Sequence, residues 1–413
     1  HTHIPIYRRI INFVVDVFIK LLLSIKTIYF LNKQKKHIFK NQFIAIYAGR
    51  TFGHDLQFFD IVSRYYYPRK VTFIYIPNEK YNPYLLECFN SNLDFIIHDL
   101  KGKLHYWVAN FLKILIFYYE VRSASWPKHF IIDPRHIVQT LSLSEGEYSF
   151  KPFKKEEESL TYLTYVPLSQ YQHLIYNHIG KRPGFSDGLQ KHCEEKIAKK
   201  YPSFFDKPFV SLVIRRKGYA GDGVNGKFRM GGPHENYIDA VKYLTANGYN
   251  VVGTGDTLHK PFSNIVGYFN LEETDLDKDC ANIFCLLNCH FLIGQFSGPY
   301  PLVNSAGGHV LITDGMALAN APLGPKDLTL YKNVYIDKKY TNIAQICKTN
   351  PALLFPNILK HKNIEIKFNT PEQILKAVKE MVARLNGEED DKRTIGLAQK
   401  LRDLAPKTTL LAH

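Results

Sequence analysis

The chain has 413 residues, which is too long for one small domain and predicts about two. Hydrophobic residues make up 45% of it and aromatic residues 14%, so the composition excludes a generally disordered protein. The 53 lysines and arginines outnumber the 38 aspartates and glutamates. The resulting net charge of +15 predicts a negatively charged partner, either a nucleotide, a nucleic acid or an anionic membrane face.

The N-terminal stretch 4–38 is strongly apolar but carries Asp16, Lys20 and Lys26 inside it. No uninterrupted apolar run therefore reaches the roughly 20 residues that span a bilayer, and the internal charges also disfavour a signal peptide. The basic residues that flank the stretch are Arg8, Arg9, Lys33, Lys35 and Lys36. This pattern is typical of an amphipathic helix in an anionic membrane interface, although a helix packed on the protein body is the alternative. We expect residues 1–40 to associate with the membrane, on the cytoplasmic face of the cell membrane.

Strands and helices alternate after this stretch, which predicts an α/β domain over residues 41–185. The expected strands span 43–48, 71–77 and 94–99. Gly49 and Gly53 lie in the loop after the first of them, where glycine permits close approach of another group to the backbone. Prolines and charges interrupt the pattern between residues 123 and 184, so we interpret this segment as an insertion and a linker.

The alternation begins again and predicts a second α/β domain over residues 186–370. The expected strands span 209–214, 249–256, 290–295 and 309–313, with a helix over 234–248. The carboxyl ends of parallel strands meet at one edge of a sheet, and ligands bind there in open α/β sheets. We expect residues 371–413 to form two amphipathic helices, broken at Asn386 and Gly387.

Arg215 and Arg216 follow the first strand of this second domain, and a glycine-rich loop containing Gly218 comes next. A guanidinium group at the end of a strand is suited to bidentate contact with a phosphate. Two surface arginines on a flexible loop are the alternative interpretation. The turns after the next strands, at 254–256 and 295–298, are also polar or glycine-rich, so their convergence with the arginines predicts a nucleotide site.

Four motifs follow one another here: IRRKG, HENYIDAVKYL, VVGTGD and NCHFLIGQFSG. Their order resembles the nucleotide-sugar-binding half of the O-fucosyltransferase-like glycosyltransferases, and the whole chain is similar to bacterial glycosyltransferases of that superfamily. The resemblance implies a GT-B architecture, in which two Rossmann-like domains face each other across a cleft and the C-terminal one holds the donor. It implies metal-independent, inverting transfer of a hexosyl or deoxyhexosyl group. The donor would be a GDP- or UDP-sugar, and the acceptor a glycan, a lipid-linked glycan or a protein in bacterial surface glycan biosynthesis.

The resemblance also implies roles for particular residues. Arg215 would grip the diphosphate with support from Arg216, Ser297 would donate a hydrogen bond to a phosphate oxygen, and Asp256 would read the ribose or the base. The other expected donor contacts are Gly218, His234, Gly253, Thr254, Phe296 and Gly298. The sequence departs from the family at Val213, where the family has a histidine, and at Asn282, where it has an acid.

Three residues are candidates for the general base that accepts the proton of the acceptor hydroxyl. Asp222 lies in the loop after the arginines, where an ordinary turn residue is the alternative. His54 and Asp55 open the first helix of the N-terminal domain, where the alternative for Asp55 is a helix N-cap. His234 begins a helix as well, so capping is the alternative to donor contact there.

We expect no metal site. Asp275 and Asp277 form an Asp-x-Asp triplet, but EETDLDKD is better explained as a solvated, helix-capping turn. Three cysteines precede His290 within an apolar segment, and we interpret them as buried thiols: Cys280, Cys285 and Cys289.

Three other functions are less compatible with the sequence. A hydride-transferring Rossmann enzyme needs a third glycine that GTGDTL lacks, and no DNA- or RNA-binding motif accompanies the basic residues. A non-catalytic nucleotide-sugar-binding or scaffold protein in surface glycan assembly is the alternative function that the sequence leaves open.

Overall fold

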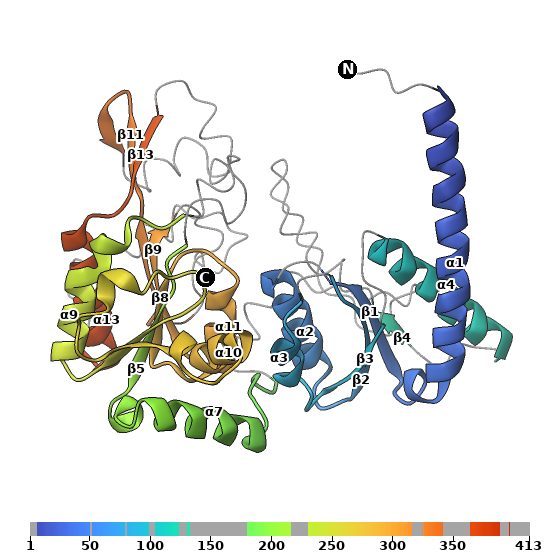
Figure 1. The fold of residues 1–413 in the computed structure, drawn as a ribbon, viewed down its shortest axis with the longest axis horizontal. Helices are drawn as coiled ribbons and strands as arrows, with labels where there is room; N and C mark the ends of the chain where they lie inside the picture. Colours follow the sequence, from blue (N-terminus) through green and yellow to red (C-terminus); the bar gives the residue numbers. More distant parts are fainter. Residues whose placement is uncertain are drawn as a thin grey trace. The chain divides into compact units, whose positions relative to one another are not determined.

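A computed structural model describes residues 6–49, 52–78, 81–98, 104–123, 130–132, 180–215, 230–315, 324, 326–341, 364–388 and 396. Contacts divide the chain into two compact units (Figure 1). Among the described residues, unit 1 contains those up to 81 and those from 90 to 132. Unit 2 contains the short segment 82–89 and everything from 180 onwards.

Unit 1 has a four-stranded parallel sheet with the order β3-β2-β1-β4. Its elements are α1 (Ile6–Ile38), β1 (Phe43–Ala48), α2 (Phe52–Tyr66), β2 (Val71–Ile76), β3 (Leu93–Ile97), α4 (His105–Ser123) and β4 (Phe130–Ile132). All six residues of β1 and all six of β2 are buried. Strands covered on both faces need apolar side chains at every position, which explains their continuous hydrophobic sequences.

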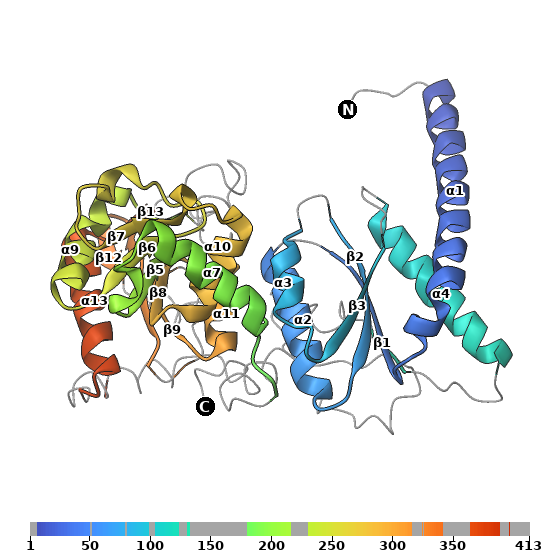
Figure 2. The same ribbon diagram turned by 60° about the horizontal axis from the view of Figure 1, so that its bottom comes forward.

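The two faces of this sheet pack differently. Aromatic side chains fill the side covered by α2, where Tyr47, Phe59 and Phe73 make ring contacts. Aliphatic side chains such as Ile44 and Ile74 fill the opposite side with α1 and α4. Both ribbon views show this three-layer arrangement (Figures 1 and 2). None of the helices in the described part of the chain meets the length and hydropathy of a membrane span.

Unit 2 is built on a six-stranded parallel sheet with the order β10-β9-β8-β5-β6-β7. Its strands are β5 (Phe209–Leu212), β6 (Asn250–Gly253), β7 (Tyr268–Asn270), β8 (Phe291–Gly294), β9 (His309–Gly315) and β10 (Leu328–Tyr331). Its α-helices are α3 (Pro83–Glu87), α7 (Asp187–Lys200), α9 (Ile238–Ala246), α10 (Lys278–Asn288), α11 (Pro299–Ala306) and α13 (Pro371–Leu385). A small antiparallel sheet is formed by β11 (Asn333–Ile336), β12 (Lys339–Thr341) and β13 (Ile364–Lys367).

The chain enters the large sheet at β5, adds β6 and β7 on one side, and then crosses to add β8, β9 and β10 on the other side. This is the strand order of the doubly wound nucleotide-binding fold, and it reverses between β5 and β8. In doubly wound sheets, ligands bind beyond the carboxyl ends of the strands at such a reversal. From the strand order alone, a ligand site is expected at the ends of β5 and β8, which are followed by Arg215 and Gln295.

The predicted α/β class is confirmed, with a parallel sheet in each unit and a helix at the N-terminal end. The helix expected over 234–248 starts as a 3₁₀ turn, η4 (His234–Tyr237), and continues as α9. Gly248 follows it with a left-handed φ of 87°, as a C-terminal glycine should. In the tail, α13 ends before Asn386 and Gly387, as expected, and the second predicted helix lies outside the described residues apart from Gly396.

Candidate functional site

Arg215 leaves β5 at the centre of the carboxyl edge of the unit 2 sheet. Its backbone N–H donates to Oε1 of Gln295 (2.8 Å), and its carbonyl accepts from Gly231 (3.2 Å). Only 8% of Arg215 is exposed. A Cβ on Gly231 would lie 2.8 Å from the Gln295 side chain, so glycine is required for this close packing. The backbone of Arg215 is thus held at the point where the strand order reverses.

The regular part of β5 ends earlier than expected, at Leu212, because a side chain replaces the neighbouring strand. The hydroxyl of Thr257 accepts the backbone N–H of Ile214 (2.9 Å) and lies 2.9 Å from the Leu212 carbonyl, to which it can donate. Val213 still donates to the Ile293 carbonyl of β8 (2.8 Å). The chain therefore stays extended and anchored as far as Arg215.

The turn after β6 packs against the protein itself. Thr254 is buried, and its N–H donates to the Leu212 carbonyl (2.9 Å). A Cβ on Gly253 would collide with the hydroxyl of Tyr268, so this glycine serves internal packing. The side chain of Asn282 accepts the N–H of Gly255 (2.9 Å), which gives this amide a structural role in the turn.

Of the predicted contacts in this turn, Asp256 is the accessible one. It is half-buried. It is a better candidate for reading a ribose or a base than Gly253 and Thr254, which are both buried.

The turn after β8 leads into α11. Phe296, Ser297 and Gly298 are all half-buried, and Gly298 is the residue before the first helical position. The ring of Phe296 packs against Tyr300 with a centroid distance of 6.0 Å. Gln295, which bonds to the backbone of Arg215, is therefore followed closely along the chain by the Ser297 hydroxyl and by the start of α11.

His234 has a different role from the capping that its position suggested. It is buried, the 3₁₀ turn it starts has no side-chain cap, and its Nε2 accepts the N–H of Leu258 (3.0 Å). The imidazole therefore ties the start of η4 to the loop that follows β6. We interpret His234 as a residue that positions this loop.

Behind these strand ends lies a buried polar network that the sequence did not reveal. The carboxylate of Asp314 accepts the backbone N–H groups of Gly232 (2.8 Å) and Asn369 (2.7 Å), and the Asn369 side chain accepts the Asp314 N–H (2.6 Å). The hydroxyl of Tyr237 accepts from Nε2 of Gln295 (3.0 Å) and donates weakly to Asp314 (3.4 Å). The network links the end of the glycine-rich loop to the residue that holds Arg215.

Burial perturbs the titration of this network. It raises the pKa of the Tyr237 phenol well above its ordinary value, and the nearby Asp314 carboxylate adds to the shift. Burial also raises the pKa of Asp314, against the effect of the backbone N–H groups bonded to it. Burial lowers the pKa of Lys332 to about 8, although the Asp314 charge acts in the opposite direction. The Lys332 amine donates to the Met230 carbonyl (2.9 Å), next to the loop end.

We expect Lys332→Met to change how stability depends on pH. Between about pH 8 and 10.5 the unfolded lysine binds more protons than the folded one, so Lys332 makes the free energy of unfolding rise with pH in this window. The methionine variant loses that rise. Its stability relative to wild type should fall by about 2 kcal/mol from pH 8 to pH 10.

Urea unfolding at pH 7, 8, 9 and 10 would measure this change, with exposed Lys339→Met as the matched control. If the difference in the free energy of unfolding between Lys332→Met and wild type stays constant from pH 8 to pH 10, the prediction is wrong.

The two predicted residues of unit 1 differ in what surrounds them. Asp55 is buried in the first turn of α2, which begins at Phe52, so it is not the N-cap. Its Oδ1 accepts the hydroxyl of Tyr47 (3.0 Å) and its Oδ2 that of Tyr75 (2.7 Å). Burial and the Asp55 charge raise the pKa of Tyr75. His54 is half-buried, and of this pair it is the better placed to meet an acceptor.

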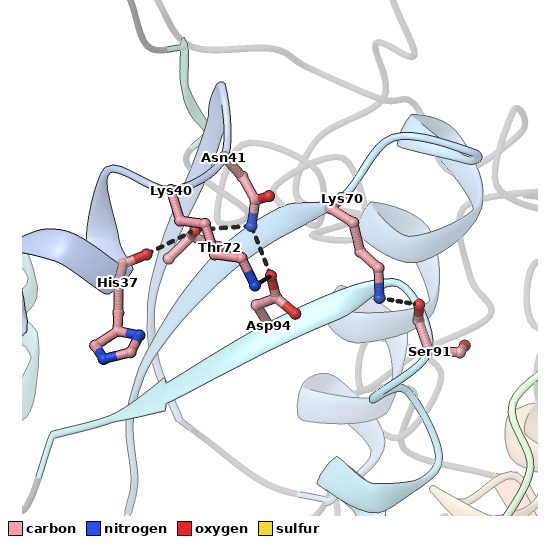
Figure 3. A network of polar contacts seen from close by, with 7 residues as sticks. All are labelled: His37, Lys40, Asn41, Lys70, Thr72, Ser91 and Asp94. Atoms are coloured by element: carbon pink, nitrogen blue, oxygen red, sulfur yellow. Dashed lines mark hydrogen bonds and ion pairs between the residues drawn. The ribbon is translucent and has the colours of Figure 1, made fainter.

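Unit 1 also has a polar groove of about 490 Å³ at the end of α1, lined by His37, Lys40 and β3. The polar groups beside it bond to each other (Figure 3): Asn41 donates to Asp94 (2.8 Å) and to Thr72 (3.1 Å), and Lys40 to Asp94 (3.4 Å). None of the predicted site residues lines this groove.

Three predicted site residues, Arg216, Gly218 and Asp222, lie outside the described residues. The interpretation of the cysteines is confirmed: Cys280, Cys285 and Cys289 are buried. Within the described ranges, no three His, Cys, Asp or Glu side chains come close enough together to hold a metal ion.

The main residues that sequence reasoning missed are Tyr237, Lys332 and Asn369, with Asp314 as their common partner. One signal was available, because Asp314 and Gly315 end strand β9 as an Asp-Gly pair, and Asp314 has a left-handed φ of 52°. Non-glycine residues in this conformation are uncommon and concentrate at turns and functional sites.

No protein-family model matches the chain, and no curated protein matches it. It is similar to the solved structure of a glycosyl transferase family 9 protein from Veillonella parvula, with 13% identity, 83% of this chain and 98% of that chain covered, and a TM-score of 0.49. A second is the ADP-heptose LPS heptosyltransferase II of Escherichia coli, with 12% identity, 84% and 100% covered, and a TM-score of 0.46. A third is the UDP-GlcNAc 2-epimerase of Neisseria meningitidis, with 11% identity, 83% and 99% covered, and a TM-score of 0.36. At these identities and scores, no residue's role passes from those proteins to this chain.

Proposed function

We propose that the chain is a glycosyltransferase that uses a nucleotide-diphosphate sugar as its donor, bound at the carboxyl edge of the unit 2 sheet. The observation that carries the proposal is the position of Arg215. It is buried where the strand order reverses between β5 and β8, and the Gln295 side chain holds its backbone. In doubly wound sheets this is the place where nucleotides bind.

The chemistry requires stabilisation of the diphosphate as it leaves. The bond from the sugar C1 to the diphosphate oxygen breaks, and negative charge develops on that oxygen. The guanidinium of Arg215 and the hydroxyl of Ser297 can stabilise this charge, with help from the backbone amides at the start of α11. Such a group of donors makes transfer without a metal ion possible, and we propose that mechanism.

Inverting transfer also needs a base. The acceptor oxygen forms its bond to C1 from the face opposite the diphosphate, and its proton passes to a protein side chain. Both carboxylate oxygens of Asp55 already accept tyrosine hydroxyls, so we favour His54 in unit 1, or Asp222 in unit 2, for this step.

We further propose a GDP- or UDP-linked hexose or deoxyhexose as donor and a glycan, a lipid-linked glycan or a protein as acceptor. The reaction would take place in the cytoplasm, at the inner face of the cell membrane, during surface glycan biosynthesis. A nucleotide-sugar-binding protein without catalysis is the second candidate, because the same Arg215 site would serve it.

A thermal-shift and calorimetric screen tests the donor. The full chain is mixed with GDP-, UDP-, ADP-, CMP- and dTDP-sugars, with magnesium or with a chelator. A donor at 100 times its dissociation constant should raise the free energy of unfolding by about 2.7 kcal/mol. We expect one nucleotide-sugar to raise the stability of the protein equally with magnesium and with the chelator. If none of them raises it, the proposed donor site is wrong.

Turnover then separates the two candidates. With the identified donor and a membrane and glycan extract as acceptor, a transferase releases nucleoside diphosphate over many cycles, whereas a binding protein releases none.

A further inference from the structure

Helix α1 exposes apolar side chains over a long stretch of its surface. Eleven large hydrophobic residues between positions 13 and 29 are exposed: Phe13, Val14, Val15, Val17, Phe18, Ile19, Leu21, Leu22, Ile25, Ile28 and Tyr29. The exposed fraction reaches 68% at both Phe13 and Tyr29. Both ribbon views show the first part of α1 extending past the unit 1 sheet, while α4 lies beside its later part (Figures 1 and 2).

Four of the five polar side chains of this stretch form a narrow stripe on the less exposed side, and the fifth, Lys26, is exposed. Asp16, Lys20, Ser24 and Thr27 are spaced by four, four and three residues, so they share one helix face. The Lys20 amine pairs with Asp16 (2.6 Å), and Thr27 is fully buried, with its hydroxyl donating to the Leu23 carbonyl (2.7 Å). A surface helix in water has the reverse distribution, with polar residues outward and apolar residues towards the protein.

The charges of α1 indicate what covers the apolar surface. The exposed lysines Lys33 and Lys36 follow the apolar stretch, and Arg8 and Arg9 precede it in the sequence. Asp16 is the only acidic residue of the helix, and it is paired with Lys20. Apolar surface bounded at both ends by positive charge is complementary to acyl chains bounded by anionic headgroups.

We propose that unit 1 docks on an anionic phospholipid bilayer through α1, with the exposed apolar side chains among the acyl chains and Lys33 and Lys36 at the headgroup phosphates. This inference does not depend on any step of sugar transfer, since it concerns binding to lipid alone.

The triple variant Phe18→Gln/Leu22→Gln/Ile25→Gln tests how much the apolar side chains contribute to lipid binding. Glutamine is a good helix former and these positions are exposed, so the helix should remain, as circular dichroism can check. Partition of the full chain into vesicles of phosphatidylcholine and phosphatidylglycerol should fall by at least about 100-fold. Val266→Gln in unit 2, where 92% of the valine is exposed, is the matched control and should partition like wild type.

The double variant Lys33→Gln/Lys36→Gln tests how much the positive charges contribute to lipid binding. Each lysine near an anionic surface contributes about a fivefold change in partition, so binding to the same vesicles should fall by about 25-fold. Vesicles of phosphatidylcholine alone should bind this variant and wild type equally. The control is Lys207→Gln/Lys339→Gln, which removes two exposed lysines of unit 2.

Two results would overturn the proposal. One is equal partition of wild type and the triple glutamine variant. The other is a wild-type dimer in sedimentation that the triple variant abolishes, with no vesicle binding by either, because the apolar surface would then face a second copy of the chain. The donor screen is unaffected by these outcomes, so lipid binding and sugar transfer fail independently.

Discussion

Replacing Arg215 with methionine is expected to weaken binding of the nucleotide-diphosphate donor by between about tenfold and 150-fold, because hydrogen bonds to charged groups contribute about 1.5–3 kcal/mol. Methionine keeps much of the volume of the arginine stem, which matters at a position only 8% exposed. The backbone bond to Gln295 does not involve the side chain and should persist. Isothermal titration with the donor found in the screen measures the change.

Two further variants make this result specific. Arg215→Lys keeps the charge but loses the planar pair of donors, so its affinity should lie between wild type and methionine. Arg384→Met removes an arginine of α13 that pairs with Glu380 (2.9 Å), and donor affinity should stay unchanged. If Arg215→Met binds the donor as tightly as wild type, the diphosphate does not sit at this strand end.

Asp314→Ala should lower the free energy of unfolding by about 4 kcal/mol, because it leaves two buried backbone N–H groups without an acceptor. These are the N–H groups of Gly232 and Asn369. Asp314→Asn tolerates the left-handed φ of 52° and keeps one acceptor oxygen, so we expect about half the loss. Urea unfolding measures both variants.

Asp239→Asn is the control for this series, because Asp239 is exposed in the first turn of α9 and should change stability by less than about 1 kcal/mol. A loss below 1 kcal/mol in Asp314→Ala would show that the network around Asp314 does not stabilise unit 2. Such a small loss would also mean that Asp314 does not hold the end of the glycine-rich loop at Gly232 in place.

The parts of the fold that the sequence predicted are those with local signals. The continuous apolar sequences of β1, β2, β5 and β8 are each bounded by glycine, proline or polar residues, which identified them as buried parallel strands. The short strands β7 and β10 were missed, because each has only partly buried residues and no distinct apolar pattern. The small sheet of β11, β12 and β13 was missed because its strands have only three or four residues each and because β13 pairs with β11 across a long sequence separation.

The residues of the candidate site show the same difference between local and long-range signals. Arg215 and Ser297 could be predicted as site residues because each follows a recognisable strand. The role of Asp55 was not, since its partners Tyr47 and Tyr75 come from two strands and meet it only in the folded sheet. Asp314, Lys332 and Asn369 depend on hydrogen bonds between distant segments, and no local pattern encodes such pairs.

The strand order of unit 2 has a consequence for synthesis of the chain. The central strand β5 (Phe209–Leu212) leaves the ribosome before both of its neighbours, and β8 (Phe291–Gly294) follows only after β6, β7 and α10. Until then one edge of an apolar strand presents unpaired N–H and C=O groups, which favour pairing with other chains. Fragments that end before β8 should therefore aggregate, whereas fragments that include β10 contain every strand needed to close both sides of β5.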